Sequence, residues 1–172
     1  MVERVISYTY MGITATTTIM HDVWKNANYS INLNNQWELS TAIANPDSAL
    51  YDGVYQSFSN KGYNNAEARC YIDFSGYETF KVYIRSFAET RYDYVVISNP
   101  DEELTSSPSS SSDGVKAHTS NNQNGGTSIS DYTLVEYNRL DGGEHRITVV
   151  YKKDNSGDEN DDRGYILIPK NQ

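Results

Sequence analysis

An acidic segment near the C-terminus holds the densest set of side chains suited to chemistry. The residues KKDNSGDENDDRG, at positions 152–164, include the carboxylates of Asp154, Asp158, Asp161 and Asp162. Carboxylate oxygens, completed by amide and backbone carbonyl oxygens, are the ligands that Ca²⁺ takes in proteins. The residue order is not that of an EF-hand, and the flanking segments have the pattern of strands. Two interpretations stay open: a calcium site at these four aspartates, or a solvated loop whose charge neighbouring Lys and Arg residues offset.

Aromatic side chains on loops or on a sheet face are a second kind of candidate, because they can stack on sugar rings. Trp24, Tyr92 and Tyr94 are the residues that we predict for such glycan contacts, whereas Trp37 fits the core of a sandwich. The chain has 15 tyrosines and four phenylalanines. This composition is common in recognition surfaces, although tyrosine is also a good strand residue.

Catalytic motifs are not evident, so we expect the protein not to be an enzyme. The three histidines are far apart and lack His or Cys partners at metal-ligand spacing. No Gly-x-Ser-x-Gly elbow and no phosphate-binding glycine loop occurs. Asp73, Glu89 and Asp93 are the first carboxylates to inspect for glycoside hydrolysis, but ordinary surface charge explains them. Cys70 is the only cysteine, which excludes an internal disulfide, and we expect it to be a small buried residue.

The elements that must position these residues are short strands. In the segment 69–98, apolar and polar residues alternate with period two before an unbroken apolar run, which predicts half-buried strands followed by one covered on both faces. We expect these three strands to be neighbours in one antiparallel sheet. Nine or ten such strands along the chain predict an all-β, antiparallel β-sandwich of jelly-roll type. We assign it to residues 36–170. Residues 1–35 are either an edge strand or an N-terminal arm that attaches to another protein.

The net charge of -9 limits the classes of partner. It argues against binding to nucleic acid, which needs a basic surface, and against binding to an anionic membrane. No apolar run approaches the ~20 residues of a membrane span. The N-terminal residues do not have the pattern of a secretory signal peptide, so we expect synthesis without one.

Several longer motifs carry a resemblance to a known group of proteins. YIRSFAE, YDYVV, KAHT, and HRITVVYKKD followed by DRGY lie within residues 36–170. This region resembles a domain of virion structural proteins, of head or tail-fibre type, from crAss-like phages that infect Bacteroides. HRITVVYKKD and the acidic segment after it are also loosely similar to jelly-roll domains of bacterial surface proteins.

The resemblance implies a non-enzymatic structural role on a phage particle. The expected partners are other virion proteins, further copies of the chain in a homo-oligomer, and host capsular polysaccharide. The expected location is the virion, after synthesis in the host cytoplasm. The alternative is a carbohydrate-binding module or adhesin that recognises bacterial surface glycans.

Overall fold

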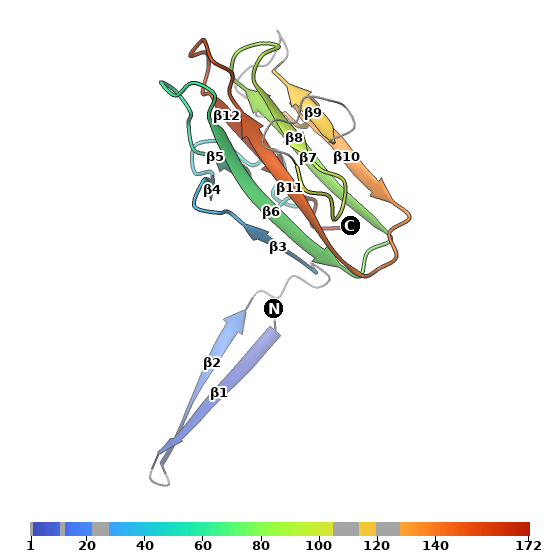
Figure 1. The fold of residues 1–172 in the computed structure, drawn as a ribbon. Helices are drawn as coiled ribbons and strands as arrows, with labels where there is room; N and C mark the ends of the chain where they lie inside the picture. Colours follow the sequence, from blue (N-terminus) through green and yellow to red (C-terminus); the bar gives the residue numbers. More distant parts are fainter. Residues whose placement is uncertain (1, 11–12, 22–27, 105–113, 120–127) are drawn as a thin grey trace.

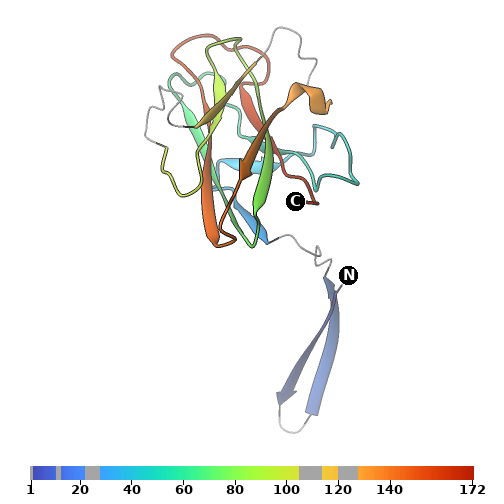
Figure 2. The same cartoon turned by 90° about the vertical axis from the view of Figure 1, so that its right-hand side faces the viewer.

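A computed structural model describes residues 2–10, 13–21, 28–104, 114–119 and 128–172, and it contains two five-stranded antiparallel sheets packed face to face (Figures 1 and 2). The first sheet has the order β10-β7-β12-β5-β4, with bounds Thr133–Asn138, Thr79–Phe87, Arg163–Leu167, Tyr55–Ser57 and Trp37–Leu39. The second has the order β3-β6-β11-β8-β9, with bounds Tyr29–Asn32, Glu67–Ser75, Glu144–Lys152, Tyr94–Ile97 and Val115–His118.

The strand order is that of a jelly roll. Without the outermost strands β4 and β3, the two sheets read β10-β7-β12-β5 and β6-β11-β8-β9. Eight consecutive strands are thus divided between two four-stranded sheets by repeated crossings, as two interlocked Greek keys require. The predicted all-β sandwich is confirmed. Pairing in the second sheet begins at Tyr29, inside the segment 1–35 that we set apart from the sandwich.

The prediction that segment 69–98 forms one sheet of three neighbours is wrong. β6 and β8 share the second sheet but lie on opposite sides of β11, and β7 belongs to the first sheet. After β6 the chain turns through Gly76, which has a positive φ of 77°, and crosses to the facing sheet. Strand partners come from β11 and β12, far along the sequence, and local alternation carries no information about them.

The core lies between the sheets. Trp37, Cys70 and Phe80 are among its buried residues, and burial raises the pKa of the Cys70 thiol. The expected burial of β8 on both faces is confirmed. Val95 and Ile97 face the core, while Val96 packs on the opposite face with Leu104 and Val150. The segment that ends at Leu104 therefore covers part of the outer surface of the second sheet.

A second apolar cluster covers the outer face of the first sheet. It contains Tyr132, Tyr165 and Leu167, and the 3₁₀ helix Ile129–Asp131 (η2) packs beside it. The guanidinium of Arg85, 1% exposed, lies 4.8 to 5.8 Å from the ring centroids of Phe87, Tyr132 and Tyr165. Aromatic faces attract such a cation, so this cluster accommodates a charge inside apolar surroundings. Within the described residues, no helix has the length and apolarity to cross a membrane.

The N-terminal residues form a separate two-stranded sheet. β1 (Val2–Tyr10) and β2 (Ile13–His21) pair antiparallel along nine positions, from Val2 opposite His21 to Tyr10 opposite Ile13. Figures 1 and 2 show this hairpin apart from the sandwich, and in the described part of the chain it joins neither of the larger sheets.

Candidate functional site

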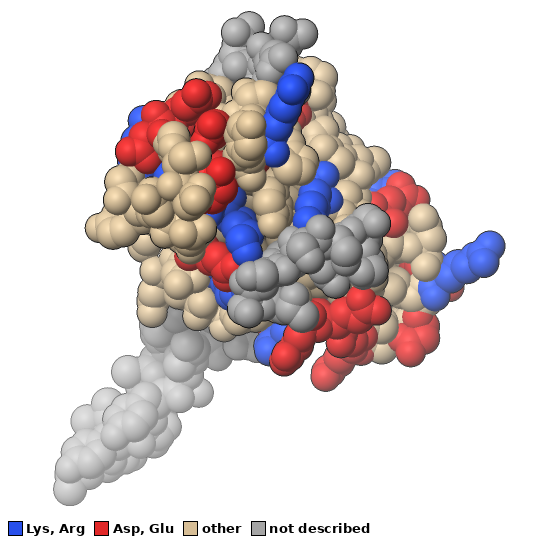
Figure 3. All heavy atoms as spheres, turned by 45° about the horizontal axis from the view of Figure 1, so that its top comes forward, with Lys and Arg blue, Asp and Glu red and all other residues tan. Residues whose placement is uncertain are grey.

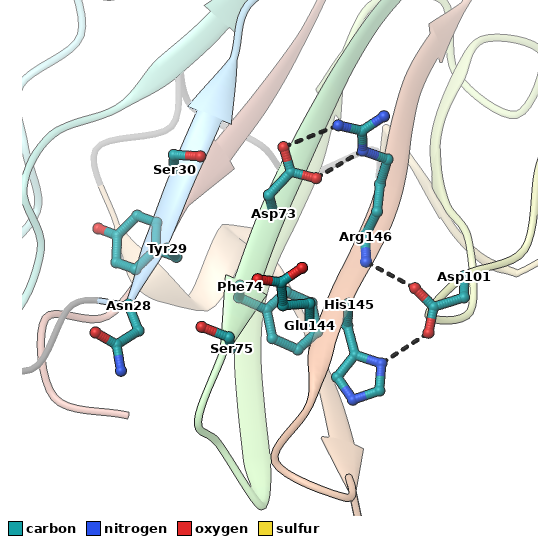
Figure 4. Close-up of a pocket in the computed structure, with 10 residues that line it drawn as sticks. All are labelled: Asn28, Tyr29, Ser30, Asp73, Phe74, Ser75, Asp101, Glu144, His145 and Arg146. Carbon is teal, nitrogen blue, oxygen red and sulfur yellow. Dashed lines mark hydrogen bonds and ion pairs between the residues drawn. The ribbon is translucent and has the colours of Figure 1, made fainter.

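A polar pocket of about 600 Å³ lies on the second sheet, near the end of β6 and the start of β11 (Figure 4). Ten residues line it, from Asn28 and the first residues of β3, the end of β6, Asp101 and the start of β11. We call it the β6–β11 pocket. The turns that precede β11 and follow β6 lie together here, because Gly76 N–H donates to the carbonyl of Gly142 (3.0 Å). The Asp141 carboxylate accepts from the Gly143 N–H at 2.7 Å and fixes the turn into β11.

Asp73 and Arg146 form the floor of the β6–β11 pocket. They are directly opposite each other in the β6–β11 register, so their side chains lie on the same face of the sheet. Arg146 donates from Nε and Nη2 to the two carboxylate oxygens of Asp73, at 2.6 and 3.0 Å. The guanidinium also lies 5.5 Å from the ring centroid of Tyr71, the next residue on the same face of β6. This two-point geometry holds both charged groups in fixed orientations.

His145 is held between two carboxylates at the edge of the same pocket. Its Nδ1 lies 2.7 Å from Asp101 Oδ2 and its Nε2 lies 3.0 Å from Asp141 Oδ1. The hydrogen bond to Asp101 is the main reason that the pKa of His145 is raised above its usual value. Asp101 also accepts from the Arg146 backbone N–H at 2.9 Å. The loop that carries Asp101 is thereby fixed to β11 and forms one wall of the pocket.

Glu144 differs from the other charged residues of the pocket. Asp73 is bound to Arg146 and Asp101 to His145, whereas no ion pair or hydrogen bond of the Glu144 carboxylate is found among the described residues. Figure 4 shows the Glu144 carboxylate over β6, between the Asp73–Arg146 pair and Ser75. The site thus offers a carboxylate acceptor, an immobilised guanidinium, the amide of Asn28, and hydroxyl groups from β3 and β6. It suits hydrogen bonding to a polar ligand rather than burial of an apolar one.

The two predicted glycan-binding aromatics that the structure describes, Tyr92 and Tyr94, lie outside the β6–β11 pocket. Trp24 lies outside the described residues. Tyr92 is 59% exposed, in the loop that precedes β8. Tyr94 is half-buried, with the Lys116 ammonium 4.7 Å from its ring centroid and the His118 ring 5.2 Å away. Tyr92 is available to a ligand, while Tyr94 packs on its own sheet, and neither lines the β6–β11 pocket.

Three of the four predicted metal ligands have separate hydrogen-bond partners. Asp154 accepts from the Ser156 N–H (2.8 Å), Asp158 from the Gly62 N–H (3.0 Å), and Asp161 from the Tyr165 hydroxyl (2.9 Å). Within the described residues, no group of three or more His, Cys, Asp or Glu side chains has an arrangement that would hold a metal ion. Calcium at this loop stays a prediction, without a converging set of ligands to support it.

The fourth aspartate belongs to a buried polar cluster beneath that loop. Asp162 is fully buried, and neither of its carboxylate oxygens has a hydrogen-bond partner in the described structure. Loss of solvent raises its pKa to about 6, which the ammonium of Lys153 partly opposes. Lys153 is also fully buried and donates to the carbonyls of Ser156 (2.8 Å) and Gly157. Asp93, buried nearby, accepts from the Asp154 N–H at 2.8 Å. An ammonium group of the chain itself supplies positive charge to this acidic end of the sandwich.

The three carboxylates chosen for inspection as glycosidase residues do not meet. Glu89 N–H donates weakly to Asp93 (3.4 Å) at the end of the sandwich near Lys152. Asp73 lies toward the opposite end of the second sheet, in the β6–β11 pocket. A pair of catalytic carboxylates needs a separation of about 5 to 10 Å, and Asp73 is not placed to complete one with the other two.

Figure 3 shows how charge is distributed on one face of the sandwich. Acidic side chains gather into clusters on this face, and basic side chains lie singly among them. A face of this kind does not offer the continuous basic surface that a nucleic-acid backbone requires.

Comparison with known proteins gives no relative. No family model, no curated protein and no solved structure matches the chain. The β6–β11 pocket was not predicted from the sequence, in which the histidines are far apart and lack His or Cys partners at metal-ligand spacing. Its one local signal is the consecutive Glu-His-Arg at the start of β11, and the register with Asp73 and the contact with Asp101 become visible only in three dimensions.

Proposed function

We propose that this protein is a non-enzymatic structural component of a phage virion that assembles through its β1–β2 hairpin. The resemblance of residues 36–170 to virion proteins supports the role on a particle, and the hairpin is the observation that supports assembly. A two-stranded sheet is at best marginally stable in water, and both of its outer edges keep unpaired backbone groups unless another strand covers them. A partner that adds a strand or packs on one face stabilises such an element.

The sequence of the hairpin favours one face for contact. Directly paired residues share a face of a two-stranded sheet, so the register divides the hairpin into two sets. One set is mostly apolar: Val2, Arg4, Ile6, Tyr8, Tyr10, Ile13, Ala15, Thr17, Ile19 and His21. The other is mostly polar: Glu3, Val5, Ser7, Thr9, Thr14, Thr16, Thr18 and Met20. An alternating apolar set on a two-stranded sheet that joins no other strand in the described part of the chain is typical of an assembly contact.

Charge also favours the hairpin as the contact between copies. Its charged residues at pH 7, Glu3 and Arg4, cancel, so the net charge of -9 resides entirely outside it. Sandwich domains with this charge repel one another, whereas neutral hairpins do not. We therefore infer that a second copy of the chain is the first partner of the hairpin. A homo-oligomer joined by the hairpins would leave the charged sandwich domains out of the contact between copies.

Protein composition of purified particles tests the role on a virion. Mass spectrometry of density-gradient fractions is expected to find this protein in particles, in constant proportion to the other virion proteins. A protein that is absent from particles, and monomeric when purified, contradicts the proposal.

A second candidate function is recognition of bacterial surface glycans. The β6–β11 pocket favours it, because this pocket combines fixed polar groups with an acceptor, Glu144, that has no partner among the described residues. Binding of the intact protein to a panel of bacterial capsular polysaccharides tests this function. Saturable binding to at least one polysaccharide supports this function, and no binding to any polysaccharide of the panel counts against it.

A further inference from the structure

We propose that the β6–β11 pocket binds a neutral oligosaccharide, with Glu144 and the Asp73–Arg146 pair as its recognition residues. This inference rests on the second candidate function, glycan recognition. It adds the location of the site, the class of sugar and the residues that make the contacts. It does not depend on assembly through the hairpin.

The arrangement of the strands gives the pocket a flat polar floor. Ser30, Asp73 and Arg146 are aligned across β3, β6 and β11 by the register of the two strand pairs. Ser75 and Glu144 form the next row, and Ser75 N–H donates to the carbonyl of Asn28 at 2.9 Å. The two rows place donors and acceptors side by side, as Figure 4 shows. A sugar ring presents hydroxyl groups that each donate and accept, so it matches a mixed surface of this kind.

The charges of the pocket exclude other classes of ligand. Arg146 is neutralised by Asp73, and His145 lies between Asp101 and Asp141. The Glu144 carboxylate is left in excess, and it repels phosphate, sulfate and acidic sugars. The lining is too polar for an apolar ligand, because desolvation of these groups without replacement hydrogen bonds is costly. A neutral polyhydroxylated ligand replaces those hydrogen bonds without adding negative charge.

Glu144 and Arg146 have the capacity for direct contacts. An ionised carboxylate accepts several hydrogen bonds, so Glu144 can take two from adjacent hydroxyl groups. Arg146 uses Nε and Nη2 for Asp73, and Figure 4 shows no contact drawn to its remaining Nη1 from the other residues of the pocket. The pair is immobilised before a ligand arrives, as is the wall at Asp101, so binding costs little side-chain entropy.

The experiment is titration calorimetry of the full chain with four probes: tetrasaccharides of mannose, galactose and N-acetylglucosamine, and a galacturonic acid tetramer. We expect at least one neutral probe to bind and the acidic probe not to bind. Glu144→Gln keeps the shape but removes the charge, and it is expected to weaken binding by about 10-fold or more, as for loss of a hydrogen bond to a charged group. Glu159→Gln, an exposed carboxylate in the acidic loop beyond the other end of β11, is the matched control and is expected to bind as the wild type does.

The outcomes separate the pocket from the wider function. If binding persists in Glu144→Gln and Arg146→Leu but is lost in Tyr92→Ala, the binding site is not the β6–β11 pocket. Glycan recognition as a function is still supported in that case. A wild-type protein that binds only the acidic tetramer overturns the class of ligand. A wild-type protein that binds neither these probes nor capsular polysaccharides overturns both the pocket and glycan recognition. Unchanged thermal unfolding of Glu144→Gln and Arg146→Leu shows that any loss of binding is local.

Discussion

Phe74 of β6 and Phe80 of β7 stack with ring centroids 4.1 Å apart and ring planes 2° from parallel, although their strands belong to opposite sheets. The two residues lie on either side of the turn at Gly76, which is the shortest connection between the two sheets. Their rings contact each other in the core, so this contact holds the two ends of the connection together. Phe74 also lies 5.5 Å from the His145 ring, which links this contact to the β6–β11 pocket.

Truncation of this stack is expected to destabilise the sandwich strongly. Phe80 is fully buried, so Phe80→Ala removes a large apolar side chain and leaves a cavity. We expect the free energy of unfolding to fall by about 3–5 kcal/mol in urea denaturation. Tyr63→Ala is the control, because Tyr63 is 67% exposed and its loss should change stability by less than about 0.5 kcal/mol. Equal effects of the two substitutions would contradict the packing described for the core.

Asp162 makes stability depend on pH in a defined direction. Its pKa is raised to about 6 in the folded chain, from 3.8. The folded state therefore binds the proton more tightly, and the free energy of unfolding decreases as pH rises from about 4 to about 6. Asp162→Asn should raise stability at pH 8, on the order of 2–3 kcal/mol, and leave it unchanged at pH 3. Urea denaturation at both pH values measures this difference, and a stabilisation that is equal at pH 3 and pH 8 would refute the buried, ionising carboxylate.

Lys153 is expected to matter most when Asp162 is charged. Lys153→Met removes the buried ammonium that lowers the pKa of Asp162 and of Asp93. Loss of one member of a buried charged group typically costs about 3–5 kcal/mol, and we expect a loss of this size at pH 8. The double variant Lys153→Met with Asp162→Asn should recover part of it, which a double-mutant cycle measures. Strict additivity of the two substitutions would show that the groups do not interact.

The pKa of His145 is expected to depend on its contact with Asp101, which forms one wall of the β6–β11 pocket. Asp101 raises the pKa of His145, so this contact stabilises the fold below pH 6.5 and the stabilisation is lost as pH rises through the raised pKa. Asp101→Asn is expected to lower the pKa of His145 in an NMR titration. His118, whose pKa is lowered by burial and by Lys116, is the internal control and should titrate as before. An unchanged His145 in Asp101→Asn would mean that the wall is not fixed in this way.

The sequence was sufficient for the fold class but not for the pairing of strands. Alternation within 69–98 predicts individual strands because it reflects which residues face the core, and Ile72, Phe74 and Val82 do so. Which strands become neighbours is decided by contacts such as Ile147 opposite Ile72, which are far apart in sequence. For the same reason, the partners of Asp73 and Asp101 in the pocket were not foreseen. The acidic residues near Asp162 stood out in the sequence, but the burial of Lys153 among them did not.

Molar mass by light scattering after size exclusion tests the assembly proposal most directly. We expect the wild-type chain to be a defined oligomer. Ile6→Lys places a charge in the apolar set of the hairpin and should give a monomer, while Ser7→Lys, the neighbouring residue in the polar set, should keep the wild-type mass. A wild-type protein that is monomeric at all concentrations, or an oligomer that Ile6→Lys leaves intact, would contradict assembly through the hairpin.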